Sequence, residues 1–440
     1  MPSSVLAITG LATTPPDWRG AEVVLSWDGP NRNLRRALHG FYPLLPRAPS
    51  PRAADLLDIA TVVYGADLGV PRGRNEDWVR HIRVLLAVRE PNFWQARADD
   101  LSYLLYVLTR DSFTFRFAPR NPEAADEPAG ADAFAGDAVC LLSGGLDSLA
   151  GALMLLRTGR RPLLLCHQSG NPAVLAAQRH VAQLLAEAGP GQAALAGVRL
   201  QAEGSSESFP AAVERESSQR ARGFLFLALA LAAAEALGVA EAYVAENGIL
   251  TLALPLSGAR VGGLSTRSTH PQVIALMNEL AHQCGLTGVL TNPFLYQTKA
   301  EIIRDLLRPA WSPFDSQRTV SCWATGRSSR QCGGCVACLV RRLAMLAAGL
   351  PDEAYELNVL GDPDSARGTD AYANLVDLLG LCTDFLTQSD STLLARSPEL
   401  LDAAACGVSL REALSLYRRF GREVRHVVHG HFPAAAKLMP

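Results

Sequence analysis

The stretch that decides the fold is Val139-Cys140-Leu141-Leu142-Ser143-Gly144-Gly145-Leu146-Asp147-Ser148. A short apolar run ends in a serine and two glycines, and the apolar segment Leu149–Leu156 follows. This order predicts a buried strand, a glycine turn and the start of a helix. Paired glycines let the backbone approach an anion closely, and the N–H groups of the first helical turn attract it. We therefore predict a phosphate-binding loop, with an ordinary strand-to-helix turn as the alternative.

No lysine follows the two glycines, so this loop differs from the G-x-x-x-x-G-K-[ST] phosphate loop. It resembles the PP-loop of ATP pyrophosphatases, which grip the pyrophosphate half of ATP while its α-phosphate is attacked. This resemblance implies that the chain binds ATP. Asp147 is suited to Mg²⁺ coordination, although an acidic residue at a helix start is also favoured by the helix dipole alone.

Strand and helix signals alternate after Gly136, which predicts a parallel sheet covered by helices on both faces. Ligands bind such sheets at the carboxyl ends of the strands, where the Ser143 loop lies. His167 ends the second strand and is either a proton carrier, a pocket donor or a structural histidine. The predicted strands are Val139–Leu142, Arg161–His167, Gly197–Leu200, Glu241–Ala245 and Gly288–Leu290, and the predicted helices are Pro172–Ala186 and Pro210–Leu237.

The segments on either side of this sheet have different patterns. We predict an α+β domain over residues 1–120, a linker at 121–136, the sheet domain at 137–350 and a helical extension at 351–440. In the first region, the predicted strands are Val5–Ile8, Ala21–Trp27, Leu56–Tyr64, His81–Val88 and Phe113–Phe117, and the predicted helix is Leu101–Thr109. In the last region, the predicted helices are Tyr372–Leu386 and Leu410–Val427.

The composition is that of a globular protein with a substantial core, since 48% of the 440 residues are hydrophobic and 19% are charged. A net charge of -2 gives no strong basic field, which argues against nucleic-acid binding. The first residues lack the pattern of a signal peptide, and the apolar run Phe224–Ala234 is too short to cross a bilayer. We expect a cytoplasmic protein with no membrane partner.

Cys332-Gly333-Gly334-Cys335-Val336-Ala337-Cys338, with Cys322 upstream, predicts a tetrahedral thiolate site. Two-residue gaps let successive sulfurs reach one ion, and Zn²⁺ is the natural occupant of a closed site with four cysteines. An iron–sulfur cluster uses the same ligands and is the alternative. A redox dithiol needs only two cysteines.

Lys299 is conspicuous because only Lys299 and Lys437 among the 41 Lys+Arg residues are lysines. The segment Asn292–Ile303 predicts a strand end, a turn and a helix that begins near Thr298. A cation in a first helical turn opposes the helix dipole, so its presence there favours a phosphate contact over a surface position.

The chain resembles the QueC family of the PP-loop superfamily, the 7-cyano-7-deazaguanine (preQ0) synthases. The likeness rests on Ser143–Ser148, on Arg222 before the long apolar helix, on Thr298–Ile303 and on the four cysteines, all in the family's order. It implies ATP phosphates held by Leu141, Leu142, Ser143, Gly144, Gly145, Leu146, Asp147 and Ser148, with Arg222 and Lys299 beside them. We also count His167 among the candidate nucleotide-binding residues. Asp147, Arg222 and Lys299 would be the catalytic set, with Mg²⁺, and Cys322, Cys332, Cys335 and Cys338 would bind Zn²⁺.

The chain departs from the family between Glu246 and Pro271, where the acceptor side of the pocket is expected, and it is about twice the family's length. Arg260 and Arg267 in this segment are candidate partners of a substrate carboxylate, and His270 is a further candidate. Long QueC-like proteins resemble those of bacterial anti-phage operons, such as QatC and the QueC-like component of some CBASS systems.

These likenesses imply adenylation of a 7-deazaguanine carboxylate, followed by attack of an amine. Ammonia would give a preQ0-type amide or nitrile, and a protein amine would give a conjugate with a partner protein from the same operon. Two alternatives remain. One is a non-catalytic PP-loop docking subunit of a defence complex, and the other is a PP-loop enzyme that modifies tRNA.

Overall fold

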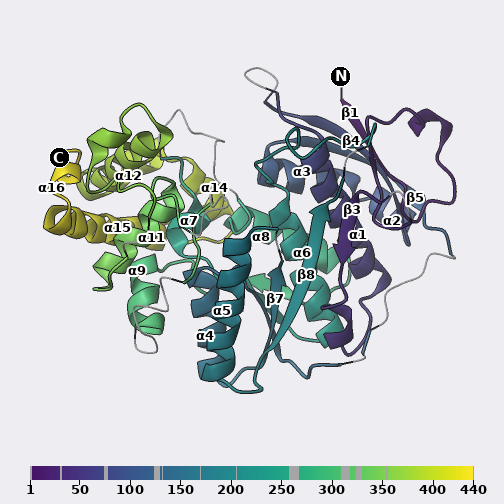
Figure 1. Ribbon diagram of the computed structural model, residues 1–440, viewed down its shortest axis with the longest axis horizontal. Helices are drawn as coiled ribbons and strands as arrows, with labels where there is room; N and C mark the ends of the chain where they lie inside the picture. Colours follow the sequence, from purple (N-terminus) through teal and green to yellow (C-terminus); the bar gives the residue numbers. More distant parts are fainter. Residues whose placement is uncertain are drawn as a thin grey trace.

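The computed structural model describes residues 2–29, 32–73, 78–122, 129–130, 132–168, 170–204, 206–256, 267–308, 318–323, 330–352 and 355–439. Figure 1 shows helices and sheets at the centre, the N-terminal elements on one side and the C-terminal helices on the other. Within the described residues, no helix is both long and apolar enough to cross a membrane.

The central sheet has six strands in the order β10-β9-β6-β7-β8-β3, and every neighbouring pair except β3 and β8 is parallel. Its parallel part confirms the predicted doubly covered α/β sheet. The strands are β3 (Leu34–Ala37), β6 (Ala138–Leu141), β7 (Pro162–His167), β8 (Ala194–Ala202), β9 (Glu241–Tyr243) and β10 (Val289–Thr291).

Alternate residues of the strands face two different cores. Ala138 and Cys140 of β6 pack with α4 (Leu146–Arg157), α5 (Pro172–Ala188) and α11 (Val336–Ala347). Val139 faces the opposite side, where α6 (Arg222–Leu237) and α8 (Pro271–Gln283) cover the sheet. A strand buried on both faces reads as a continuous apolar run, which explains the strength of this signal in the sequence.

A second sheet, built from the N-terminal residues, has four parallel strands in the order β2-β1-β4-β5. Its elements are β1 (Ser3–Ala7), β2 (Val23–Leu25), β4 (His81–Val88), β5 (Ser112–Pro119), α2 (Pro91–Gln95) and α3 (Ala98–Thr109). Residues of this sheet and of the central sheet belong to one continuous hydrophobic core. Through β3, the N-terminal residues also supply the antiparallel edge strand of the central sheet.

The prediction of a strand at Leu56–Tyr64 is wrong, because these residues lie in α1 (Pro51–Gly69). Ser50 caps the helix by accepting a hydrogen bond from the Ala53 N–H, and Pro51 occupies its first position. Nearly every residue of α1 is buried, so the apolar residues show no one-sided helical period and resemble a buried strand.

The long helix predicted over Pro210–Leu237 is correct only in its second part, since α6 begins at Arg222. The preceding residues form turns, and Gln219 has a positive φ of 47°. The helix ends at Gly238, which takes the left-handed conformation typical of a C-terminal cap.

The C-terminal residues form a helical group with its own hydrophobic core. The predicted helices at Tyr372–Leu386 and Leu410–Val427 are confirmed as α12 and α15. The helices of the C-terminal residues are α12 (Asp370–Thr387), α13 (Asp390–Arg396), α14 (Glu399–Ala405), α15 (Leu410–His431) and α16 (Pro433–Ala436). Two short helices, α7 (Gly248–Leu252) and α9 (Lys299–Ile302), precede them in the chain.

Candidate functional site: a glycine loop, a buried carboxyl pair and a cysteine knot

The glycine loop lies between β6 and α4, as predicted, so Leu141 ends the strand and Leu146 begins the helix. Gly144 has a φ of +87°, a conformation that side chains with a Cβ rarely adopt. A Cβ there would also lie 3.1 Å from the Gln178 backbone nitrogen. The loop is held by its two serines, since the Ser143 N–H donates to Ser148 Oγ (3.2 Å) and Ser148 Oγ donates to the Gly145 carbonyl (3.0 Å).

Asp147 is the centre of a buried polar cluster directly behind this loop. Its Oδ2 accepts hydrogen bonds from Lys299 Nζ (2.6 Å), Asn247 Nδ2 (2.8 Å) and the Asn247 backbone N–H (3.2 Å). Its Oδ1 is buried and has no hydrogen-bond partner. The structure therefore brings together two of the three predicted catalytic residues and leaves one carboxylate oxygen unpartnered.

Glu246 lies next to Asp147 and was not among the predicted site residues. Burial, and next the negative charge of Asp147, raise the pKa of Glu246 well above its ordinary value. Burial alone would raise the pKa of Asp147 as well, but the positive charge of Lys299 and hydrogen bonds from its neighbours lower it. The site thus holds two carboxyl groups of opposite tendency, with Asp147 ionised and Glu246 inclined to keep its proton.

Lys299 is only 3% exposed and occupies the first position of α9. Thr298 caps this helix in a capping box, in which the threonine side chain accepts from the Glu301 N–H and the Glu301 carboxylate accepts from the Thr298 N–H. The cap fixes the direction in which Lys299 leaves the backbone. The energetic cost of a cation at a helix start is offset here by the Asp147 carboxylate.

Helix α15 of the C-terminal group contacts the same segment. Arg419 Nη2 donates to the Tyr296 carbonyl (2.6 Å), and Arg419 Nε donates to Glu301 Oε1 (2.7 Å). Glu423 Oε1 accepts from Thr298 Oγ1 (3.0 Å). The residues that aim Lys299 are therefore held by the C-terminal extension as well as by the sheet.

Arg222 and His167 make contacts separate from the Asp147 cluster. Arg222 is the first residue of α6, donates to Gln219 Oε1 (3.2 Å) and lies over the Phe226 ring. The His167 ring is buried between Phe226 and Tyr64, and burial lowers its pKa to about 4. In this structure His167 is a packed, neutral histidine of the core.

The four predicted metal ligands come together. The sulfur atoms of Cys322, Cys332, Cys335 and Cys338 all lie within 4.8 Å of one another. Two backbone N–H groups donate to the sulfurs, from Cys332 to Cys322 Sγ (3.4 Å) and from Cys335 to Cys332 Sγ (3.3 Å). Such N–H···S contacts favour the thiolate form that binds a metal. The donor set fits Zn²⁺.

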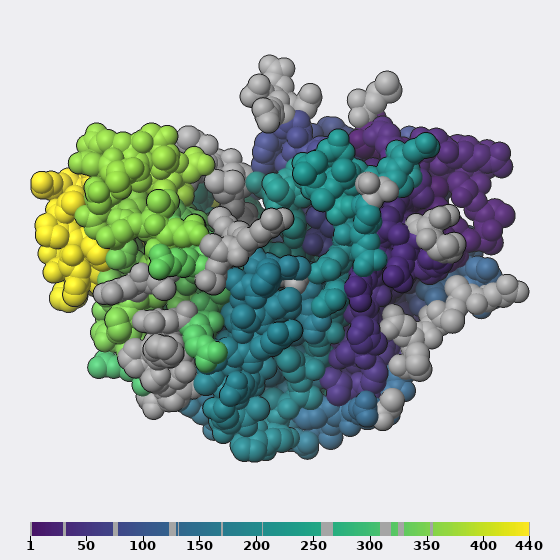
Figure 2. Space-filling model, viewed as in Figure 1, coloured from purple at the N-terminus to yellow at the C-terminus, as the bar shows by residue number. Residues whose placement is uncertain are grey.

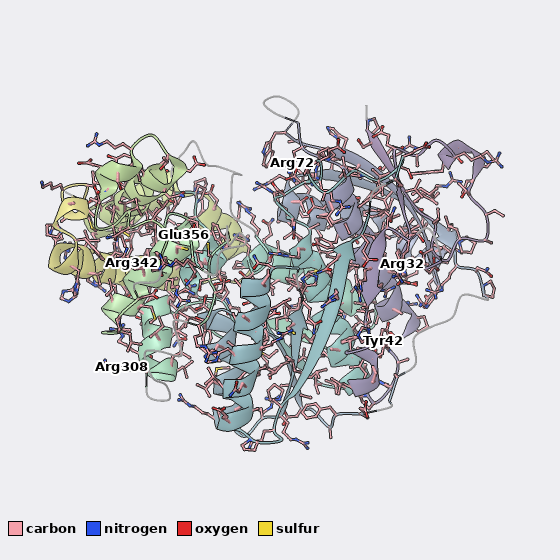
Figure 3. The ribbon with its side chains drawn as sticks, in the orientation of Figure 1. Arg32, Tyr42, Arg72, Arg308, Arg342 and Glu356 are labelled. Atoms are coloured by element: carbon pink, nitrogen blue, oxygen red, sulfur yellow. The ribbon has the colours of Figure 1, made fainter. Side chains whose placement is uncertain are left out.

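The cysteine knot is attached to both the glycine loop and the C-terminal group. The Val320 N–H donates to the Gly144 carbonyl (3.1 Å), which joins the knot's leading segment to the loop. On its other side, the Glu356 N–H donates to the Gln331 carbonyl (2.9 Å), and Asn374 Nδ2 of α12 donates to the Gly334 carbonyl (2.9 Å). Glu356 and Arg342 mark this side of the knot in Figure 3. Hydrogen bonds therefore join the knot's leading segment to the loop and the knot itself to the C-terminal group.

The face shown in Figure 2 is hollowed between the yellow-green C-terminal helices and the teal and purple residues opposite them. Arg267 and His270 are both buried just before α8, on the acceptor side predicted from the sequence. Arg260, the other predicted carboxylate partner, lies outside the described residues.

Comparison with known proteins places this site in a family. The family model described as "Queuosine biosynthesis protein QueC" matches residues 268–349. Two proteins named 7-cyano-7-deazaguanine synthase are each similar to 49% of the chain. The one from Aromatoleum aromaticum is 32% identical over 234 residues, which cover 95% of its length. The one from Thiobacillus denitrificans is 31% identical over 233 residues, which cover 96% of its length.

These relatives are matched along almost their entire length, whereas about half of this chain lies outside the match. The family-model match spans the Lys299 segment and all four clustered cysteines. The likeness seen in the sequence rests on the glycine loop, Arg222, the Lys299 segment and the cysteine knot. The chain belongs to the QueC family.

Proposed function

We propose that this chain uses ATP to adenylate the carboxylate of a 7-deazaguanine and then transfers the acyl group to an amine. Membership of a family of 7-cyano-7-deazaguanine synthases supports the substrate class. The observation that carries the proposal is the cluster of Asp147, Glu246 and Lys299 beside the glycine loop. It puts fixed charge at the carboxyl end of β6, where a parallel sheet binds its ligands.

The reaction has two steps that share one site. A carboxylate oxygen of the substrate attacks the α-phosphorus of ATP, the bond to the bridging oxygen breaks, and pyrophosphate leaves. An amine nitrogen then attacks the acyl carbon, AMP leaves, and the nitrogen loses a proton to water. Ser143–Ser148 would hold the departing pyrophosphate, while Lys299 and Arg222 would balance its growing charge.

Mg²⁺ fits the carboxyl pair. Asp147 Oδ1 is buried without a partner, and the Glu246 carboxyl beside it is the second oxygen donor that a hard cation requires. When bound, Mg²⁺ would neutralise phosphate charge. In its absence the proton kept by Glu246 relieves the repulsion between the two carboxyl groups.

Zn²⁺ fits the four cysteines and would be structural, since all four ligands come from the protein and leave no open position. Metal analysis of the purified protein checks this. We expect about one zinc per chain and loss of the metal in Cys332→Ser, with iron in place of zinc as the contradicting result.

The nucleophile separates two products. Ammonia would give an amide, which a second ATP can dehydrate to the nitrile, and a protein amine would give a deazaguanine–protein conjugate. The elements outside the family-model match include α12 to α16 and the N-terminal sheet, and they support a role beyond that of the shorter relatives. Anti-phage defence with a protein acceptor is the setting we propose for it.

The test is an assay of the full-length protein with ATP, Mg²⁺, 7-carboxy-7-deazaguanine and ammonium. We expect AMP and pyrophosphate in equal amounts. AMP no higher than in a Ser143→Ala control would overturn the proposal. The assay is then repeated with proteins encoded in the same operon. Mass spectrometry identifies the acceptor as the protein that gains the mass of a deazaguanine.

A further inference from the structure

Arg267 is a buried cation to which the described residues supply no counter-ion. It is 8% exposed, and within the described residues its guanidinium forms no hydrogen bond or ion pair. Arg110 repels it, while Glu399 and Asp402 attract it only from beyond ion-pair distance. A buried charge is unfavourable unless it is paired. Arg267 therefore favours the binding of an anion that the described residues do not supply.

His270 lies three residues further on and presents an unused donor. It is 1% exposed, and its Nδ1 accepts a hydrogen bond from the Gln272 N–H (3.2 Å). The proton of the neutral ring therefore sits on Nε2, which is buried and has no partner. Burial, and then the charges of Arg267 and Arg110, lower the pKa of His270 to about 4, so this donor is uncharged near neutral pH.

The two residues lie at the edge of the sheet where the glycine loop is found. Helix α8 leads into β10, a parallel strand, so the start of α8 lies at the carboxyl ends of the strands. Ser268 packs closely against Gly223 of α6, where a Cβ would come within 2.1 Å of the Ser268 Oγ, next to Arg222. The first turn of α8 adds its own partial positive charge.

We propose that Arg267 and the Nε2–H of His270 form an oxyanion site that binds the carboxylate of the deazaguanine substrate. This inference rests on the proposed function, to which it adds the residues that recognise the acid. The guanidinium fork matches the two oxygens of a carboxylate, and the histidine donor fixes the plane of the group. Held in this way, the carboxylate is kept at the edge of the sheet where the phosphates of ATP are bound.

The test measures binding without ATP, so that it does not depend on catalysis. Calorimetry on the full-length protein compares 7-carboxy-7-deazaguanine with 7-deazaguanine, which lacks the acid. We expect the native protein to prefer the acid about tenfold or more, and Arg267→Met to lose this preference. Arg425→Met, an exposed arginine on α15, is the matched control and should keep it.

Several results would overturn the proposal. One is an Arg267→Met variant that still prefers the acid, and another is a native protein that binds both compounds equally. A third is a variant that binds ATP more weakly with its preference for the acid intact, which would assign Arg267 to the nucleotide phosphates. Because removing an unpaired buried charge relieves strain, Arg267→Met should melt no lower than the native protein, and Arg267→Lys should keep part of the preference. Failure of the proposed function would appear separately, as a native protein that binds the acid but forms no AMP.

Discussion

Two buried clusters of charge in this molecule differ in how their carboxylate oxygens are used. Between α1 and β5, Arg72 and Arg80 face Asp67 and Asp111, with ion-pair distances of 2.5 to 2.6 Å and side chains at most 7% exposed. Figure 3 marks Arg72 in this N-terminal part. Here every carboxylate oxygen of Asp67 and Asp111 accepts a hydrogen bond, and a third guanidinium, that of Arg220, lies close by.

Behind the glycine loop, two carboxyl groups meet one ammonium, and one carboxylate oxygen has no partner. The first cluster adds no chemistry, because all of its carboxylate oxygens are used within the protein. The second has one unpartnered carboxylate oxygen, which a ligand cation could use. The difference teaches that an unpartnered carboxylate oxygen, more than burial, separates the candidate site from a structural network.

The sharpest test of the N-terminal cluster, between α1 and β5, is Asp111→Asn. This change leaves Arg72 and Arg80 buried and short of one anion, so we expect a loss of about 3–5 kcal/mol in the free energy of unfolding. Urea unfolding measures it. Asp17→Asn removes an exposed pair with Arg116 and should cost less than about 1 kcal/mol. Equal losses in the two variants would contradict the comparison.

For the cluster behind the glycine loop, Asp147→Asn should affect activity much more than stability. Glu246 remains as a counter-ion for Lys299, because its pKa is raised partly by the charge that this change removes. We expect AMP formation to fall by roughly 10²–10³-fold, with little change in the unfolding midpoint. A large drop in the midpoint together with retained activity would show that Asp147 is structural.

Arg419→Ala tests the support that α15 gives to Lys299. It removes the contacts to Tyr296 and Glu301, so we expect kcat/KM for ATP to fall about tenfold, or about 1.4 kcal/mol. Arg419→Lys should recover part of the loss. Arg425→Ala, exposed on the same helix, should have no effect, and a similar fall in both alanine variants would contradict a positioning role.

The smallest effect is expected at Glu423. Burial raises its pKa to about 7, above that of the unfolded chain, so the folded state binds the proton more tightly. The stability that the Glu423 proton contributes is complete below the pKa of Glu423 in the unfolded chain. It is lost as pH rises through about 7, the pKa in the folded state. Between about pH 5 and pH 8 the melting temperature should fall more in the native protein than in Glu423→Gln. Glu412→Gln, exposed on α15, should follow the native protein; parallel curves for all three would refute the shift.

Local patterns predicted much of the fold and the site. The glycine loop, the cysteine spacing and the alternation of strands with helices each depend on neighbouring residues. The structure contains the predicted loop between a strand and a helix, the four cysteines side by side and the parallel sheet. Whether Arg222 binds phosphate stays a prediction, as does the division into domains.

Features that depend on distant partners escaped the sequence. Glu246 follows β9 with no motif around it, and only the pairing of β6 with β9 brings it to Asp147. Strand β3 has the sequence Leu-Arg-Arg-Ala, which is too short and too charged to predict a strand. Helix α1 was mistaken for a strand because it is buried on all sides.

The pairing of β3 with β8 has a consequence for how the protein is made. Leu34 pairs with Ala202, so the ribosome must synthesise β6, α4, β7 and α5 before β3 finds its partner. At roughly 5–20 residues per second, β3 waits on the order of ten seconds or more on the nascent chain. Strand β3 therefore leaves the ribosome early but stays unpaired until β8 has been synthesised, and chaperones have that interval in which to bind it.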